Sequence, residues 1–378
     1  MTLITGMRRA LSGAALLFLL LPAGAGADDQ AAPGKIPVIV DTDMGADDWL
    51  AVAYVASSRH ADLLGVTVVG NGLSPCDDAA RNARHILAMS PRNAGKPVGC
   101  GSAWPMDGYA SYPRIWRETA AGMMGEMVSA PGAGGNAMDG PQLLAKLLSE
   151  SAEPVQILAT GGLTNIATVL KTNPRLREKI RSVVSMGGAI RAGGNLRVHG
   201  FTDDHGNTRA EWNYYIDPVA ARTVFDSGVP IRLVPLDATN GVPLTRDFLA
   251  RTDQLRGSAL GAFVQRTFAR ISAATSYGEY YHWDPLAAAI ALNPDLCNRV
   301  ERLTLAVIAD EGRDLGLPGG QPADLFPLAN FEGRTRKPLR EDAAGATVVS
   351  PQGHPVDVCM HADAAAFEND FLATIGSN

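Results

Sequence analysis

Four carboxylates fall within eight residues near the start of the chain: Asp41, Asp43, Asp47 and Asp48. They follow a short apolar run at residues 36–40, which is typical of a buried strand, and the last two open a segment with helical apolar spacing. A helix N-terminus stabilises one or two carboxylates by about 0.3–1 kcal/mol each, which is too little for four. Either their pKa values rise or a cation balances them. We expect a hard cation with oxygen ligands, of which calcium accepts roughly six to eight.

Two other interpretations of this cluster stay open at this point. Asp47 or Asp48 could simply cap the helix while Asp41 faces solvent. Phosphatases of the haloacid type also have two Asp residues separated by one position. Their motif has Thr or Val two places after the second Asp, however, where this chain has Gly45. The sequence therefore disfavours the phosphatase.

The elements that would position the carboxylates alternate along the chain. Short apolar runs predict strands, and apolar residues at helical spacing predict helices. Strands are expected at residues 36–40, 63–69, 155–159, 183–186, 229–234 and 303–308, and helices at 46–57, 77–89, 163–171, 218–225, 259–275 and 285–292. Such alternation indicates an α/β fold with a single open, mainly parallel, Rossmann-like sheet and helices on both faces. Residues 344–360 are expected to form a C-terminal hairpin.

Polar residues collect where the predicted strands end, at residues 41–43, 70–71, 160–161 and 187–188. Because ligands bind at the carboxyl ends of parallel strands, these residues predict one pocket built from many strand ends. Two long segments rich in Gly and polar residues, 104–140 and 193–209, resist assignment to helix or strand. Loops of this length tend to be lids or binding loops.

The cluster from Asp41 to Asp48, Asp-Thr-Asp-Met-Gly-Ala-Asp-Asp, resembles the signature of the inosine–uridine nucleoside hydrolase family, which is usually Asp-x-Asp-Pro-Gly-x-Asp-Asp. The departure is Met44 in place of Pro. Because Pro offers no side-chain ligand, we expect this change to affect the stiffness of the turn rather than the chemistry. Further segments follow in that family's order: Val69-Gly-Asn71, Thr160-Gly-Gly-Leu-Thr-Asn165, Met186-Gly-Gly188, Gly194-Asn195, Glu211-Trp-Asn213, Asp217-Pro218 and His282-Trp-Asp-Pro285.

The resemblance implies that Asp43, Asp48, Asp284 and the main-chain carbonyl of Thr160 hold Ca2+. Such a set leaves positions for water and for two ribose hydroxyls. A calcium-bound water would be the nucleophile, and Asp43 would be its general base. Taken alone, Asp284 before Pro285 could equally be a helix cap.

The resemblance also implies contacts with the sugar. Asp47 and Asn71 would bind ribose hydroxyls, and Asn195, Glu211 and Asn213 would hold the 5′ side. Positive charge grows on the sugar as a glycosidic bond breaks, and carboxylates such as Asp47 and Glu211 would stabilise it. Glu211 and Asn213 could instead be an ordinary surface pair.

The leaving group is expected to be a purine. Many members of the family have His directly before the last calcium ligand, where this chain has Trp283. With Glu211-Trp-Asn213, this resembles the purine-specific (inosine–adenosine–guanosine) branch, in which two tryptophans sandwich the base. We expect Trp283 to supply one face and Trp116 the other, with Trp104 as the alternative. His282 is a further candidate for contact with the base, as an acid for the leaving group, although in a helix it would point about 100° away from Trp283.

The N-terminus is typical of a secretory signal peptide over residues 1–27, which leaves one hydrolase domain over residues 28–378 and a periplasmic or secreted protein. Arg8 and Arg9 precede an apolar run at 14–21 and the exit Ala25-Gly-Ala27. That run is shorter than the roughly 20 residues that span a bilayer. We therefore expect no membrane contact after cleavage, although an uncleaved anchor remains an alternative.

The charge and composition of the chain limit the classes of binding partner that we expect. A net charge of −6 without a basic stripe argues against a nucleic-acid partner and leaves a small-molecule nucleoside. Four cysteines, at 76, 100, 297 and 359, allow three disulfide pairings. The resemblance implies a homo-oligomer, either a dimer or a tetramer. Two other functions stay open: a hydrolase of pyrimidine nucleosides, and a non-catalytic nucleoside-binding protein, which would show two lobes and no acidic metal site.

Overall fold

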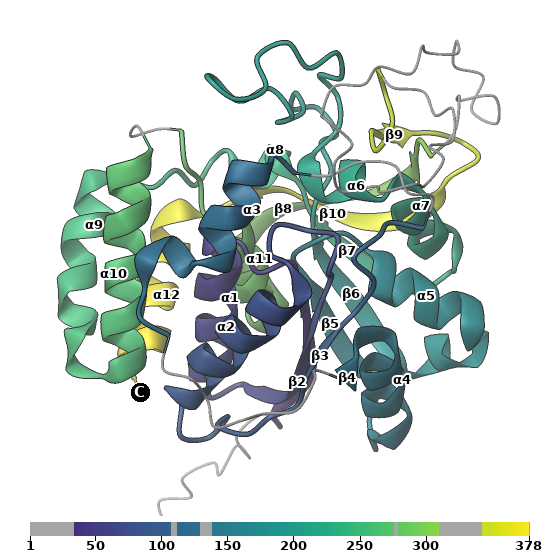
Figure 1. The fold of residues 1–378 in the computed structure, drawn as a ribbon. Coiled ribbons are helices and arrows are strands. Elements are labelled where there is room, and N and C mark those ends of the chain that lie inside the picture. The colour runs from purple at the N-terminus through teal and green to yellow at the C-terminus, as the bar shows by residue number, and fades with distance from the viewer. Residues whose placement is uncertain (1–33, 107–111, 129–137, 276–278, 310–341, 378) are drawn as a thin grey trace, which may run out of the picture. The chain divides into compact units, whose positions relative to one another are not determined.

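A sheet of ten strands runs through the part of the chain described in the computed structural model, which covers residues 34–106, 112–128, 138–275, 279–309 and 342–377 (Figure 1). The expected signal peptide lies outside these residues. The strands follow the order β4-β3-β2-β1-β5-β6-β7-β10-β8-β9. Their bounds are β1 (Ile36–Thr42), β2 (Ala61–Val68), β3 (Val98–Cys100), β4 (Met138–Asp139), β5 (Val155–Ala159), β6 (Ile180–Met186), β7 (Ile231–Val234), β8 (Cys297–Val307), β9 (Thr347–Val349) and β10 (His354–Ala362).

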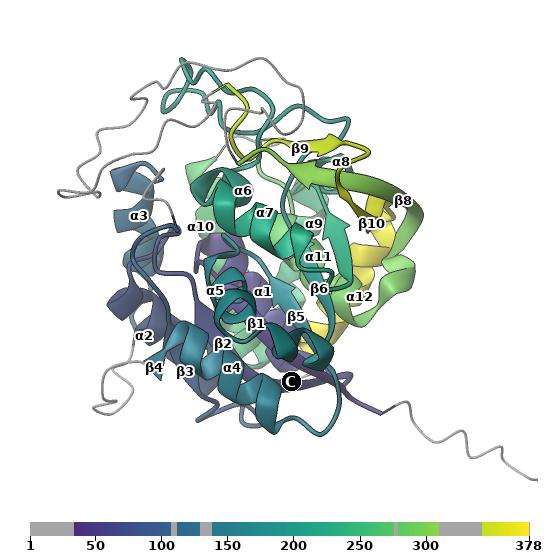
Figure 2. The same cartoon turned by 90° about the vertical axis from the view of Figure 1, so that its right-hand side faces the viewer.

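Helices cover both faces of this sheet (Figures 1 and 2). One face carries α1 (Ala46–Ser57), α2 (Cys76–Ala88), α10 (Ala259–Ala274), α11 (Trp283–Leu292) and α12 (Ala364–Gly376). The other carries α4 (Gly140–Glu150), α5 (Thr164–Thr172) and α7 (Pro218–Asp226). The shorter helices are α3 (Arg114–Ala121), α6 (Trp212–Ile216), α8 (Leu236–Thr239) and α9 (Arg246–Arg251), with 3-10 turns at Met123–Gly125, Pro174–Lys179, Thr252–Gly257 and Pro294–Leu296.

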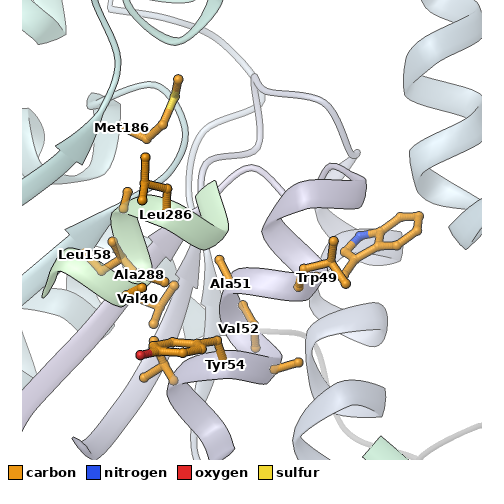
Figure 3. Close-up of a cluster of buried hydrophobic side chains, with 14 of the residues drawn as sticks. Val40, Trp49, Ala51, Val52, Tyr54, Leu158, Met186, Leu286 and Ala288 are labelled. Carbon is orange, nitrogen blue, oxygen red and sulfur yellow. The ribbon is translucent and has the colours of Figure 1, made fainter. Parts of the chain in front are cut away.

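The core lies on both sides of the parallel strands because their side chains alternate between the two faces. Val38 and Val40 of β1 join the cluster under α1 and α11, whereas Ile39 joins the cluster under α5 and α7. Figure 3 shows Val40 among the strand and helix residues of the first cluster. This double burial explains why the strands read as continuous apolar runs in the sequence.

The α/β class and the mainly parallel sheet are confirmed, but the C-terminal hairpin is wrong. Strands form at both ends of residues 344–360, yet each pairs with β8, which lies between them. The turn crosses the backbone of β8 at Gly353, where a Cβ atom would come within 2.2 Å of the Leu305 carbonyl oxygen. Two apolar runs joined by a short turn therefore look like a hairpin in sequence, although a third strand separates them.

Two disulfides settle the pairing that the sequence left open. Cys76 at the start of α2 is bonded to Cys100 at the end of β3, and Cys297 of β8 is bonded to Cys359 of β10. Among the residues described, no helix has the length and apolarity that a bilayer span requires.

Candidate active site

The acidic cluster lies at the point in the sheet where successive strands stop being added on one side of β1 and begin to be added on the other. From β1 the chain builds outward through β2, β3 and β4, and then returns to place β5 on the other side of β1. Ligands of open α/β sheets bind at such a switch point, beyond the carboxyl ends of the strands. Asp43 follows β1 and Thr160 follows β5, so the predicted convergence of strand ends is found here.

Asp48 ties this edge of the sheet together. Its carboxylate accepts hydrogen bonds from the Gly45 amide at 2.8 Å and the Thr160 hydroxyl at 2.7 Å, and from the Thr42 hydroxyl. It therefore does cap the start of α1, as the simpler interpretation held, and it also links β1 to β5. Asp41, by contrast, is fully buried rather than solvent-facing, and accepts from Thr67 and Asn165 at 2.6 and 2.8 Å.

Three carboxylates could share a cation. Asp47, Asp48 and Asp284 each offer an oxygen, and these oxygens all lie within 4.8 Å of one another. Two oxygens bound to one calcium at about 2.3–2.6 Å can be at most roughly 5 Å apart, so the group fits such an ion. Of the four predicted ligands, this group contains Asp48 and Asp284, and it has Asp47 rather than Asp43 as its third member.

Burial makes this cluster costly without a cation. It raises the pKa of Asp47 to about 7, with the charge of Asp48 adding to the effect. Burial and the neighbouring carboxylates also raise the pKa values of Asp43 and Asp284 well above their usual range. Desolvation and like charge both penalise the ionised form, and a divalent cation would reverse both effects.

Asp43 is held between two backbone segments. Its carboxylate accepts from the Leu73 amide at 3.2 Å, and it lies 1% exposed against the loop after β2. A Cβ atom on Gly72 would come within 2.1 Å of the Asp43 Cβ, and one on Gly161 within 2.7 Å. Glycine is needed at both positions for Asp43 to reach the site.

Met44 adopts a backbone conformation that its usual counterpart could not. Its φ is 61°, its amide donates to the Thr42 hydroxyl at 3.1 Å, and its carbonyl accepts from the Trp49 indole at 2.8 Å. Proline fixes φ near −65° and has no amide hydrogen. Met44 therefore forms a turn that Pro could not form, and the expectation that the change leaves the chemistry unaffected stays a prediction.

We accordingly predict that Met44→Pro, although it restores the usual family residue, destabilises the protein. Loss of the fully buried Met side chain alone costs about 2–5 kcal/mol, and the altered φ would displace Asp43 as well. Met44→Leu keeps the volume and the amide and should cost less than about 1.5 kcal/mol. Thermal unfolding of both variants tests this; equal midpoints for Met44→Pro and wild type would contradict it.

Asn71 presents an unused acceptor to the site. Its side-chain amide donates to Thr164 at 3.1 Å, and Thr164 in turn donates to Asp217 at 2.7 Å. Asn71 is 2% exposed, and its side-chain oxygen has no hydrogen-bond partner among the residues the structure describes. A buried polar atom without a partner is costly, and a substrate hydroxyl would supply one.

Glu211 and Asn213 are buried and organised rather than a surface pair. Glu211 accepts from the Asn213 amide at 2.9 Å and from the Gly188 amide at 3.0 Å, and burial raises its pKa to about 7. The Asn213 side chain donates to Met186 O at 3.2 Å and accepts from the Tyr112 hydroxyl at 3.1 Å. Asn195 accepts from the Trp212 amide at 3.0 Å. These contacts place the three predicted 5′-side residues around the end of β6.

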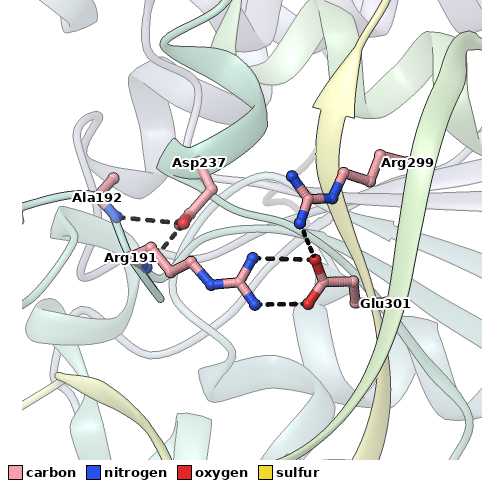
Figure 4. A network of polar contacts seen from close by, with 5 residues as sticks. All are labelled: Arg191, Ala192, Asp237, Arg299 and Glu301. Atoms are coloured by element: carbon pink, nitrogen blue, oxygen red, sulfur yellow. Dashed lines mark hydrogen bonds and ion pairs between the residues drawn. The ribbon is translucent and has the colours of Figure 1, made fainter.

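Hydrogen bonds and an ion pair hold the loop after β6 against α8 and β8, and we call this set of contacts a clamp (Figure 4). Asp237 of α8 accepts from three successive amides, those of Ile190, Arg191 and Ala192, at 2.7–3.1 Å. The Arg191 guanidinium pairs with both carboxylate oxygens of Glu301, to which Arg299 also donates. This clamp begins two residues after Gly188, so it also steadies the amide that holds Glu211.

The two predicted base-stacking tryptophans lie in different aromatic groups. Trp283 is half-buried at the start of α11, next to Asp284, and its ring packs edge-on against Tyr280 with centroids 4.9 Å apart. Trp116 packs against Trp212 and against Phe201 of the loop at 193–209, both at 5.5 Å. No ring contact joins Trp116 to Trp283 in the described chain. Trp104 is also half-buried, just beyond β3.

His282 lies outside the site, and the structure speaks against its predicted contact with the substrate. Its ring is fully buried among Phe248, Phe268 and Phe367, with centroids 4.7–5.4 Å apart. Burial lowers its pKa to about 3, so the ring is neutral. The adjacent residue Trp283 points elsewhere because successive positions at a helix start diverge by about 100°.

Tyr280 lies beside Trp283 and the acidic cluster, although it was not among the site residues predicted from the sequence. It is 8% exposed, and its hydroxyl has no hydrogen-bond partner among the described residues. The hydroxyls of three other buried tyrosines, Tyr54, Tyr112 and Tyr214, contact Asp370, Asn213 and Ser185. Burial, with the charges of Asp47 and Asp284, raises the pKa of Tyr280 well above its usual range, so it remains a donor beside the acids.

Comparison with known proteins agrees with this geometry. Residues 38–369 match the family described as inosine-uridine preferring nucleoside hydrolase. A pyrimidine-specific ribonucleoside hydrolase, RihA, from Citrobacter koseri is 31% identical over 277 residues, which are 71% of this chain and 82% of that protein. The corresponding RihA of Photobacterium profundum is 34% identical over 205 residues, 54% of this chain and 61% of that one.

Solved structures share the fold. The inosine-uridine preferring nucleoside hydrolase from Bacillus anthracis aligns with a TM-score of 0.68 at 23% identity, over 91% of this chain and 100% of that one. A purine-preferring ribonucleoside hydrolase from Gardnerella vaginalis aligns with a TM-score of 0.68 at 22% identity, over 90% and 98%. Since the family match spans nearly all of the described strands and helices, the chain belongs to the inosine-uridine preferring nucleoside hydrolase family and is an N-glycosyl hydrolase that acts on nucleosides.

Proposed function

We propose that this chain is an exported, calcium-dependent ribonucleoside hydrolase that favours purine nucleosides. The observation that carries the metal is the convergence of Asp47, Asp48 and Asp284 at the switch point of the sheet. Thr160, whose hydroxyl donates to Asp48, and Asp43, on which the charges of Asp47 and Asp48 act, would add further oxygen ligands. Bound there, calcium would neutralise the carboxylates, orient two ribose hydroxyls and lower the pKa of the attacking water.

In the proposed reaction, Asp43 takes the proton from the attacking water. Calcium beside it would favour the ionised form of Asp43, which is the form that accepts a proton. Water adds to the anomeric carbon, the bond from that carbon to the base nitrogen breaks, and the base leaves with the bonding electrons and takes up a proton. Asp47 and Glu211 stabilise the positive charge that grows on the sugar.

The sugar is held on two sides in this proposal. The free acceptor oxygen of Asn71 and the carboxylate of Asp47 bind ribose hydroxyls. Asn195, Glu211 and Asn213 hold the 5′ side, where the side chains of Asn195 and Glu211 already accept hydrogen bonds from the amides of Trp212 and Asn213. Such preorganisation reduces the entropy that binding would otherwise cost.

Purine preference rests on Trp283, whose flat ring lies beside the metal ligands. We predict that Trp283→Ala lowers kcat/KM for inosine by about 5- to 150-fold, since stacking on a base is worth about 1–3 kcal/mol. The fall in kcat/KM should be smaller for uridine, whose base has a smaller ring system. Trp283→Phe, which keeps a flat ring, is the matched control. Equal losses for inosine and uridine in steady-state assays would defeat the stacking argument.

Pyrimidine nucleosides are the second candidate substrate class, because the RihA relatives are described as pyrimidine-specific. Hydrolysis of inosine, guanosine, adenosine, uridine and cytidine, with calcium and after chelation, separates the candidates. Calcium-dependent turnover led by purines supports our proposal, whereas turnover led by uridine or cytidine replaces it with the pyrimidine reading. Absence of all turnover by folded protein with calcium would favour a nucleoside-binding protein.

Tyr280 is proposed to donate a hydrogen bond to the leaving base, which gains negative charge as the bond breaks. Tyr280→Phe should lower kcat/KM for natural nucleosides about tenfold, the equivalent of one hydrogen bond of about 1.4 kcal/mol. For p-nitrophenyl riboside, whose leaving group departs readily unaided, kcat/KM should fall less than about twofold. The matched control is Tyr281→Phe, and the same loss for both classes of substrate would refute this role.

Export is proposed from the signal-like residues 1–27. The two disulfides support it, because such bonds persist in oxidising compartments. Expression of the full chain with cell fractionation, followed by the mass of the mature protein, tests this: an N-terminus at Asp28 in the exported fraction is expected, and an intact cytosolic chain would contradict it.

A further inference from the structure

The loop between β2 and α2 reaches directly into the proposed active site. The amides of Leu73 and Ser74 donate to the side chain and the carbonyl of Asp43, at 3.2 and 3.0 Å. The same loop carries Asn71, with its unpaired buried oxygen. Two groups of the proposed mechanism, the general base and a sugar ligand, therefore depend on where this loop lies.

One end of this loop is fastened covalently. Cys76, three residues after Leu73, is bonded to Cys100 at the end of β3. The next residue, Gly101, donates its amide to Val68 O at 2.8 Å, at the other end of the loop. The disulfide thus closes residues 69–75 between two fixed points, the end of β2 and the end of β3.

Local packing shows how closely the disulfide and the loop fit. A Cβ atom on Gly70 would come within 2.7 Å of the Cys76 sulfur and within 2.8 Å of the Gly101 carbonyl oxygen. The helix that follows has Pro75 at its N-cap, with no side-chain hydrogen bond to hold its first turn. The covalent bond therefore holds the first residue of a helix that has no capping side chain.

From this geometry we infer that the Cys76–Cys100 disulfide positions the active site. It holds Asn71, and the Leu73 and Ser74 amides that donate to Asp43, in a fixed place relative to β1. This inference rests on the proposed roles of Asp43 and Asn71. Reduction would leave the sheet intact but release the loop, so substrate affinity and calcium affinity would both fall. The two cysteines touch neither substrate nor metal and act only through the loop.

The second disulfide is a matched control within the same chain. Cys297–Cys359 joins two strands, β8 and β10, that already pair along their length. Strands β6 and β7 separate β10 from β5, the strand that Thr160 follows. Loss of the Cys297–Cys359 disulfide should lower the stability of the protein without moving any group of the proposed mechanism.

The test compares the double variant Cys76→Ser/Cys100→Ser with Cys297→Ser/Cys359→Ser, each as the mature chain. For the first we expect KM to rise and kcat/KM to fall at least about tenfold at 25 °C, with calcium alone binding at least about fivefold more weakly by calorimetry. For the second we expect a lower Tm with kcat/KM and calcium affinity within about twofold of wild type. Equal functional losses in both variants, or a first variant that loses only Tm, would overturn the inference.

A reversible version covers the case in which the first variant does not fold. In the Cys297→Ser/Cys359→Ser protein, dithiothreitol can reduce only Cys76–Cys100, which gains two electrons and two protons as the thiol is oxidised. Calcium affinity should fall on reduction and return on reoxidation, while far-ultraviolet circular dichroism stays constant; unchanged affinity in the reduced protein would refute the inference. Because this readout is calcium binding, it stands even if wild type turns over no nucleoside, which would instead count against the proposed function.

Discussion

Asp284→Ala is expected to abolish nucleoside hydrolysis, lowering kcat/KM by at least about a thousandfold. Asp284 is one of three carboxylates whose oxygens lie within 4.8 Å of one another, and two carboxylates hold a divalent cation far more weakly than three. Loss of the cation removes both the orientation of the sugar and the activation of water. The expected loss of about 4 kcal/mol in transition-state stabilisation lies within the range of such electrostatic effects.

The same substitution should have the opposite effect on the stability of the calcium-free protein. Asp284 is buried, and the charges of Asp47 and Asp48 act against its ionised form. Removing it relieves that repulsion, so calcium-free Asp284→Ala should melt at or above the Tm of calcium-free wild type at pH 8. Added calcium should raise the Tm of wild type only.

The control is Asp226→Ala, which removes an exposed carboxylate at the end of α7 that pairs with Arg222. It should leave turnover within about twofold and stability within about 0.5 kcal/mol. If Asp284→Ala retained turnover close to that of Asp226→Ala, the proposed metal site would be untenable.

The fold was largely predictable because its strands are buried on both faces. Residues 155–159 and the helix at 46–57 have in the structure the bounds that their apolar spacing predicts. Such segments carry their pattern in consecutive residues, and no distant partner is needed to recognise them. The hairpin failed for the converse reason, since the insertion of β8 between β9 and β10 depends on residues some 50 positions earlier.

The site was predictable only where residue types are unusual. Four acids in eight residues predict a cation site. The family resemblance adds Asp284 to the predicted ligands, although it lies more than 230 positions away. Which oxygens group together was not predictable, because the grouping of Asp47 with Asp48 and Asp284 depends on how α1 meets α11. The role proposed for Tyr280 was not predictable, because an unpaired buried hydroxyl has no signature in sequence.

The stability of the calcium-free protein should fall as pH rises from about 4 to 8, against the usual trend for acidic groups paired with cations. Burial raises the pKa of Asp47 and of Glu211 to about 7, and it raises the pKa values of Asp43 and Asp284 well above their usual range. In the unfolded chain these groups titrate near 4. Between the two values the folded state binds more protons than the unfolded state, so the free energy of unfolding decreases with increasing pH.

Calcium should reverse this dependence, because it binds the ionised carboxylates and must displace protons from them at low pH. The rise in Tm on adding calcium should therefore be small at pH 5 and reach at least several degrees at pH 8, in thermal scans of chelated and calcium-loaded protein. A calcium-free Tm that climbs between pH 5 and pH 8 would mean that the buried acids are already paired without metal. Asp284→Asn should weaken the pH dependence of the calcium-free protein and abolish the calcium effect, because one residue contributes both the raised pKa and the ligand.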